Sequence, residues 1–196
     1  MINKELIDYF HRLPEKIIAT VHKDPDYDAI GSLLAMGTLI NALGKEVTLY
    51  SPDINTKQFK HLPGVKKIQR TPKSEYDLAI FLDCSDQNRI AEPTNFPNTK
   101  KIINIDHHQD NTQFGNMNLV LKISSVGEIL FNLYKALNVP LTKESAINIY
   151  AAICFDTGNF KFSNTSPDTF LAASELLKMN INTTKISEWI FEEKPK

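Results

Sequence analysis

The chain contains few cysteines and glycines, and it carries almost no net charge. Only two cysteines occur in 196 residues, without a CxxC pair, which excludes a disulfide framework. The 22 basic and 23 acidic residues leave a net charge of −1, so the sequence lacks the basic surface expected of a protein that binds long duplex nucleic acid. A small phosphorylated ligand held at one local site is still compatible with this charge.

Long apolar runs are also missing. No run is long enough to span a bilayer, and no basic-then-apolar leader opens the chain, so we expect no membrane partner. Cys84 and Cys154 both have apolar neighbours, which predicts buried, unreactive thiols. Together these features favour a cytoplasmic protein. The chain is long enough to bury a core without disulfide support.

Short apolar segments alternate with segments of helical periodicity. Five runs have the length and β-branched content of strands: 16–22, 46–51, 76–86, 100–108 and 118–124. Six segments have helical spacing: 3–13, 28–44, 124–138, 142–156, 166–179 and 183–193. The alternation predicts an α/β fold, with a parallel sheet flanked by helices on both faces and followed by a helical C-terminal segment. Ser125 and Glu128 have the spacing of a capping box at one helix start.

Three of the predicted strands end in acidic or imidazole side chains. The first runs into "TVHKDPDYDAIGS", which places His22, Asp24, Asp26 and Asp28 at every second position. The others end at Asp83 and at the "DHH" of residues 106–108. The carboxyl ends of parallel strands lie along one edge, where open α/β sheets bind ligands. These side chains are therefore expected to converge.

Taken singly, each aspartate is more often a turn former or helix cap, which is how we interpret Asp86 and Asp110. The convergent set is different, because several carboxylates at one crevice would repel each other without a cation. Imidazole and carboxylate donors without thiolate favour Mn²⁺, with Mg²⁺ or Co²⁺ as substitutes. The donors exceed the needs of one ion, which predicts two ions, a bridging carboxylate and phosphoester hydrolysis by a metal-activated water.

Four motifs in order resemble the DHH phosphoesterase superfamily: "HKDPDYDAIGS" (22–32), "FLDCSD" (81–86), "DHH" (106–108) and "ICFDTGNF" (153–160). Within it, "PDYDAIGS" and "DTGNFKFSNTSPDT" are most similar to the group of oligoribonucleases that are also phosphatases of 3′-phosphoadenosine-5′-phosphate (pAp). The resemblance implies a manganese-dependent phosphodiesterase and phosphatase. Its expected partners are RNA fragments a few nucleotides long, or nucleotide phosphates.

The resemblance also implies a role for individual residues. Two manganese ligand sets share Asp83 as the bridge: His22, Asp26 and Asp83 for one ion, and Asp28, Asp83, His107 and Asp156 for the other. His108 is expected to donate to a non-bridging oxygen of the scissile phosphate, and Asp106 to orient a neighbouring side chain. Arg89 either contacts a phosphate or is a structural arginine.

Domain organisation follows from the same resemblance. Residues 1–187 are expected to form the DHH catalytic domain, and 188–196 to begin a linker to a DHH-associated domain that grips substrate in the family. An isolated chain is then expected to be weakly active. Four alternatives stay open: a family II inorganic pyrophosphatase, a cyclic dinucleotide phosphodiesterase, a RecJ-like exonuclease and a metal-binding regulatory module without turnover. Homodimerisation also stays open.

Overall fold

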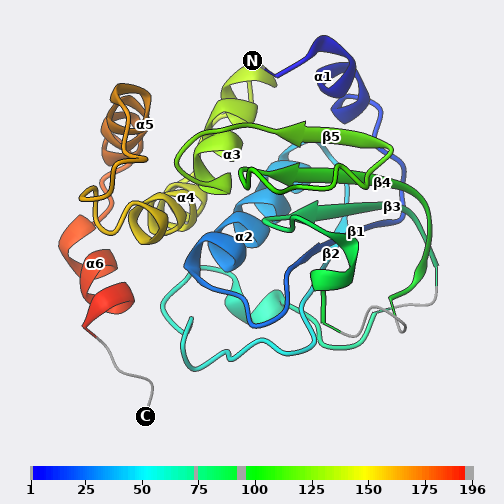
Figure 1. Ribbon diagram of the computed structural model, residues 1–196, viewed down its shortest axis with the longest axis horizontal. Helices are drawn as coiled ribbons and strands as arrows, with labels where there is room; N and C mark the ends of the chain where they lie inside the picture. The colour runs from blue at the N-terminus through cyan, green and yellow to red at the C-terminus, as the bar shows by residue number, and fades with distance from the viewer. Residues whose placement is uncertain (1, 73–74, 92–95, 193–196) are drawn as a thin grey trace.

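A five-stranded parallel sheet forms the centre of the computed structural model, which describes residues 2–72, 75–91 and 96–192 (Figure 1). Its strands lie in the spatial order β2-β1-β3-β4-β5. In chain order they are β1 (Ile17–Val21), β2 (Val47–Tyr50), β3 (Glu75–Leu82), β4 (Asn98–Asp106) and β5 (Met117–Val120). Each adjacent pair is parallel, so all carboxyl ends meet at one edge of the sheet.

The described residues form six α-helices beside the sheet: α1 (Lys4–Phe10), α2 (Tyr27–Ala42), α3 (Val126–Ala136), α4 (Lys143–Asp156), α5 (Pro167–Leu177) and α6 (Thr183–Phe191). In the described connections lie two short 3₁₀ helices, η1 (Val65–Lys67) and η2 (Gln87–Arg89). The predicted α/β fold, with flanking helices and a helical C-terminal part, is confirmed. The residues predicted as a linker include 193–196, which lie outside the described residues, and α6 continues to Phe191.

The two faces of the sheet are covered differently. All six α-helices contribute to one hydrophobic core, which includes the sheet residues Ile17, Leu78 and Ile103. On the opposite face, the described part of the second core contains no α-helical residue. There, Phe81 packs against Phe114, and the cover consists of loops and the segment after η2. The two faces thus differ in the kind of cover that the described residues provide.

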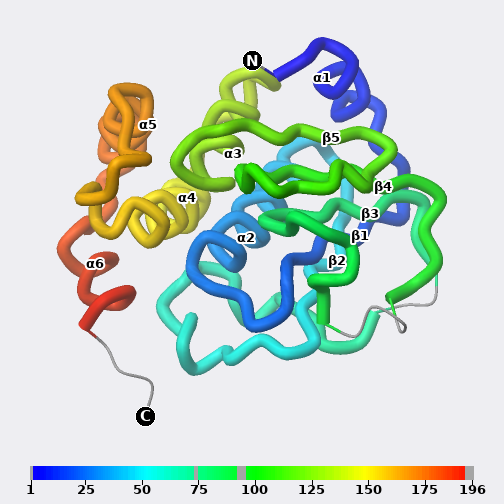
Figure 2. The backbone as a smooth tube through the Cα atoms, in the orientation of Figure 1, coloured from blue at the N-terminus to red at the C-terminus, as the bar shows by residue number. Residues whose placement is uncertain are grey.

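The helices form two layers beyond the sheet. Helix α2 packs on β1 and β2, and α4 packs on α2 and α3. A Cβ added at Gly31 would lie 2.5 Å from the carbonyl oxygen of Asn148, so glycine permits the close approach of α2 and α4. Helices α5 and α6, orange and red in Figure 2, pack outside α4. Among the described helices, none combines the length and the apolarity needed to cross a membrane.

The register of the sheet brings the strand ends together. Val21 pairs with Leu82, and Leu82 pairs with Ile105. Each strand end is directly followed by a polar side chain, so these side chains start from neighbouring positions. Asp83 then adopts a left-handed backbone (φ 54°), while its amide still donates to the carbonyl of Ile105 at 3.0 Å. Aspartate tolerates this conformation better than most residues, and it turns the carboxylate out of the strand direction.

Candidate metal centre

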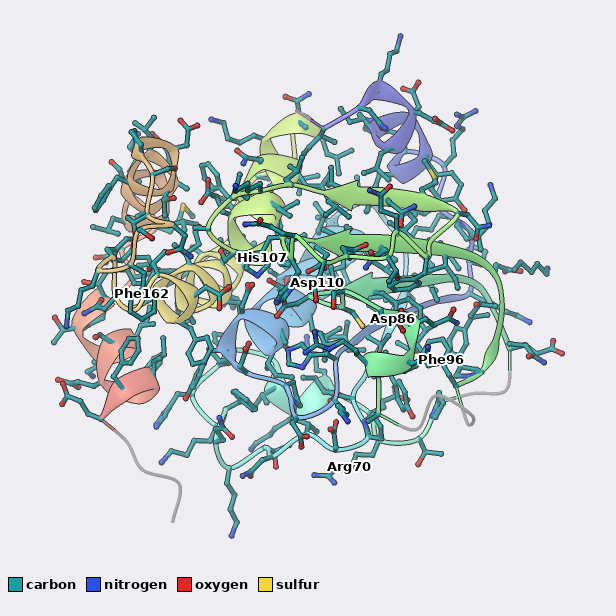
Figure 3. All side chains as sticks on the ribbon, in the orientation of Figure 1. Arg70, Asp86, Phe96, His107, Asp110 and Phe162 are labelled. Atoms are coloured by element: carbon teal, nitrogen blue, oxygen red, sulfur yellow. The ribbon has the colours of Figure 1, made fainter. Side chains whose placement is uncertain are left out.

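Side chains from five elements meet at the carboxyl edge of the sheet. His22 follows β1, Asp83 follows β3, and His107 and His108 follow β4. The other contributors start α2 or end α4: Asp26 caps α2, Asp28 lies in its first turn, and Asp156 is the last residue of α4. Figure 3 labels His107 between the strand ends and α4. The structure thus brings together every side chain for which the sequence analysis expected a role in metal binding or catalysis.

Three overlapping groups of side chains can be formed, and within each group the donor atoms lie within 4.8 Å of one another. One contains His22, Asp26 and Asp83, and another contains Asp28, His107 and Asp156. The third joins Asp83 to the DHH triplet, Asp106, His107 and His108. The first group contains the same residues as the ligand set expected for one ion. The second group contains the ligands expected for the other ion except Asp83, which belongs to the first group.

Asp83 faces both groups with different oxygens. Its Oδ2 lies 3.5 Å from Nε2 of His22, and its Oδ1 lies 3.5 Å from Nε2 of His107. The side chain is almost completely buried, and Oδ1 has no hydrogen-bond partner. A buried carboxylate oxygen without a donor is costly, and a cation would satisfy it. Asp83 therefore fits a bridging position between two ions.

Asp28 is fully buried and is held by a helix N-terminus. Its Oδ2 accepts the amide of Val126 at 2.8 Å, and its Oδ1 accepts the amide of Gly127 at 2.9 Å. Both amides belong to the first turn of α3, whose positive dipole end favours a carboxylate. Ser32 also donates to Oδ1 at 3.1 Å. Oδ1 thus accepts two donors, whereas Oδ2 accepts one, retains a second lone pair and lies 3.8 Å from Nε2 of His107, so Asp28 can still offer Oδ2 to an ion near His107.

Two histidines are oriented by backbone carbonyls. Nδ1 of His22 lies 2.7 Å from the carbonyl of Lys23, and Nδ1 of His107 lies 3.4 Å from the carbonyl of Ile123. A carbonyl can only accept, so Nδ1 carries the proton and Nε2 faces the carboxylates. Metal-binding histidines commonly have their other ring nitrogen oriented by such a hydrogen bond.

Burial and mutual charge perturb the pKa values of these groups. Burial favours the neutral form of His22 and His107, but attraction to the surrounding carboxylates outweighs it and raises their pKa values to about 9 and about 11. Burial, with repulsion from Asp83, raises the pKa of Asp26 to about 6 and that of Asp28 well above its ordinary value. Asp83 is also buried, yet His107 and His22 hold its pKa well below the usual range. Without a metal, the positive charge of the protonated histidines compensates part of the negative charge of the carboxylates.

His108 takes part in a separate hydrogen-bond chain. Its Nδ1 donates to Oδ1 of Asp106 at 2.8 Å, and this contact raises the pKa of His108. Asp106 is fully buried, and its Oδ2 accepts from Nδ2 of Asn111 at 2.6 Å. Asn111 also contacts Oδ1 of Asn104 at 2.8 Å. The chain fixes the imidazole of His108, whose Nε2 is left to contact a ligand.

Several polar partners were not foreseen from the sequence. Asn111 follows the DHH triplet closely, but an asparagine there reads as a loop residue. Asn164 donates from Nδ2 to the carbonyls of Ser124 and Asp156, both at 3.1 Å, and so connects two segments beside the site. The predicted capping box is half correct. Ser125 does accept the amide of Glu128, but the Glu128 carboxylate accepts from Ser124 and Thr169 instead.

Arg89 lies next to the centre without entering any of the donor groups. Its Nη1 donates to Oγ of Ser85 at 3.0 Å, and its carbonyl accepts the amide of Lys23 at 2.7 Å. It therefore connects the loop after β3 to the loop after β1, which is a structural use. Asp86 accepts the amide of Asn88 and caps η2, as expected for a turn former.

Fold and site together define a class: a parallel α/β domain whose carboxyl edge carries an aspartate–histidine cluster able to bind metal. Comparison with known proteins is more specific. Residues 16–153 match the DHH family, N-terminal domain, and the chain belongs to this family. The resemblance noted from the four motifs is confirmed.

Three similar proteins illustrate the relationship. The bifunctional oligoribonuclease and PAP phosphatase NrnA of Thermus thermophilus is 31% identical over 177 residues, which cover 88% of this chain and 52% of that protein. The protein of the same name from Bacillus subtilis is 28% identical over 186 residues, covering 93% and 59%. The crystal structure of an exopolyphosphatase-related protein from Bacteroides fragilis superposes with a TM-score of 0.87 at 26% identity, covering 99% and 62%. The chain thus spans half to three fifths of these relatives.

Proposed function

We propose that this domain hydrolyses phosphate esters of short oligoribonucleotides and of pAp, using two Mn²⁺ ions. The observation that carries the proposal is the position of Asp83. Its two carboxylate oxygens face two different groups of potential metal ligands, and Oδ1 has no hydrogen-bond partner. Such an arrangement suits a pair of divalent ions that share one carboxylate. The mixture of imidazole and carboxylate donors favours Mn²⁺.

We propose one ligand set for each of the two ions, following the groups of neighbouring side chains described above. His22, Asp26 and Asp83 would hold one ion, and Asp28, Asp83, His107 and Asp156 the other. When bound, two such ions supply a nucleophilic water at neutral pH and neutralise charge on the phosphoryl oxygens. The protein contributes the fixed positions of the ligands, which α2, α4 and three strand ends determine.

His108 has the geometry of a donor to the scissile phosphate. Its Nδ1 is engaged by Asp106, so Nε2–H is the donor that points away from this contact. The side chain is 39% exposed, whereas its partner is fully buried. Asp106 stabilises the positive charge on the imidazole, and Asn111 fixes Asp106. We assign His108 the role of stabilising negative charge on a phosphoryl oxygen.

Similarity to the two NrnA proteins supports the substrate class. Their names describe oligoribonuclease and pAp phosphatase activities, and they match this chain over most of its length. The chain covers only part of each relative, so we propose that full activity requires the linker from residue 188 onward and the DHH-associated domain expected to follow it.

The test compares four substrates with added Mn²⁺: pAp, a short RNA, pyrophosphate and a cyclic dinucleotide. The proposal expects phosphate release from pAp or mononucleotide release from RNA, and loss of both in Asp83→Asn. Preferred cleavage of pyrophosphate or of the cyclic dinucleotide would replace it with the corresponding alternative. Metal binding without cleavage of any substrate, also in a protein with the second domain, would favour a regulatory module.

A further inference from the structure

A hollow of about 490 Å³ opens directly beside the metal centre. His107 and His108 form one wall, and the remaining lining comes from the DHH loop, the β5–α3 connection and Asn164. Lys122 is the one lysine or arginine among the described residues that line it. Asp110 is the one carboxylate in the lining, and it is exposed to solvent.

Both sequence neighbours of Lys122 contact residues of the DHH triplet. The amide of Leu121 donates to the carbonyl of Asp106 at 3.0 Å, and the carbonyl of Ile123 faces Nδ1 of His107 at 3.4 Å. Both neighbours of Lys122 are therefore tied to residues of the site. The position of its Cα relative to His107 is fixed, although the side chain itself is exposed.

The ammonium group of Lys122 is available to a ligand. Within the described part of the chain, its side chain makes neither a hydrogen bond nor an ion pair, while two other exposed lysines, Lys100 and Lys178, pair with carboxylates. Asn164, which also lines the hollow, donates to the carbonyls of Ser124 and Asp156. A hollow lined by one free cation together with His108 is suited to a second anionic group of the substrate.

We propose that Lys122 binds the non-scissile phosphate of the substrate, and that this contact makes the domain prefer nucleotides with two neighbouring phosphate groups. The inference rests on the proposed function. In pAp, a single ribose separates the 5′ phosphate from the 3′ phosphate that is cleaved, and in RNA the next phosphodiester is equally near. While the scissile phosphate lies at His107 and His108, the second phosphate lies in the hollow.

The experiment compares pAp with adenosine 3′-monophosphate, which lacks the second phosphate. Wild type, Lys122→Ala and Lys122→Arg are assayed for phosphate release with Mn²⁺. Lys143→Ala serves as the control, because it removes an exposed lysine at the end of α4 that lies opposite to Asp156. Lys122→Ala is expected to lower kcat/KM for pAp about ten-fold, as for loss of one charged hydrogen bond, and to change it less than about two-fold for the monophosphate. Lys122→Arg keeps most of the preference.

Equal losses on both substrates, or an unchanged value for pAp, would overturn the inference. Failure of the proposed function is recognised separately, because wild type would then cleave neither nucleotide. In that case calorimetric binding of pAp with Mn²⁺ decides: Lys122→Ala must weaken it about ten-fold, and an unchanged dissociation constant contradicts the role of Lys122. An unchanged melting temperature of Lys122→Ala verifies that the loss of activity or binding is not caused by impaired folding.

Discussion

Asp28 has two tasks that can be separated experimentally. It belongs to a metal donor group, and it also accepts the amides of Val126 and Gly127 and the hydroxyl of Ser32 while fully buried. Asp28→Ala leaves these three donors without an acceptor, at about 1–3 kcal/mol for each group that stays unsatisfied. Relief of repulsion among the carboxylates and rebonding of the serine hydroxyl offset part of this cost. We expect a net loss of about 3 kcal/mol in the free energy of unfolding.

The assay is urea unfolding in EDTA, so that metal binding does not contribute. Asp156→Ala is the matched control, because its carboxylate belongs to the same donor group but is 18% exposed, and its one ion-pair partner among the described residues is His107. We expect the control to lose about 1 kcal/mol or less. Asp28→Asn should lie between them, because its oxygen can accept one amide while its NH₂ group cannot accept the other. A lower melting temperature by about 6–12 °C should accompany Asp28→Ala. Equal stability of the two alanine variants would refute the capping role of Asp28.

Three further predictions concern catalysis, metal binding and packing. His108→Ala should retain bound manganese yet lose about 100- to 1,000-fold in kcat in a phosphate-release assay; loss of the metal would contradict its assigned role. Because the pKa values of His22 and His107 are about 9 and about 11 in the metal-free protein, both are protonated at pH 7. Manganese binding should then release protons and weaken as the pH falls, which calorimetry in buffers of different ionisation enthalpy detects; binding without proton release would count against these histidines as ligands. Gly127→Ala would bring a Cβ within 2.5 Å of Cβ of Ala152, and should destabilise the protein by about 1–3 kcal/mol in urea unfolding; a neutral effect would show that α3 and α4 can separate freely.

The sequence was sufficient to predict that the site residues converge, because parallel strands share one carboxyl edge. His22, Asp83 and His107 each follow a strand, and the α/β alternation was readable from periodicity. Boundaries were less accurate. The first helix was expected to extend to Leu13, but it ends at Phe10, before the backbone restriction that Pro14 imposes on Leu13.

Interactions between distant segments could not be predicted. The capture of Asp28 by amides of α3 joins residues almost one hundred positions apart, and backbone amides have no sequence signature. The orientation of Asp106 by Asn111 depends on a loop conformation that composition does not determine. The packing of apolar loop residues, such as Phe114, on the second sheet face could not be predicted from the sequence either.

The bridging position proposed for Asp83 can be examined by anomalous diffraction from crystals equilibrated with Mn²⁺. We expect two peaks per chain, one between Asp83 and His22 and the other between Asp83 and His107, and the loss of at least one peak in Asp83→Asn. Peaks remote from Asp83, or none at saturating Mn²⁺, would contradict the two-metal assignment.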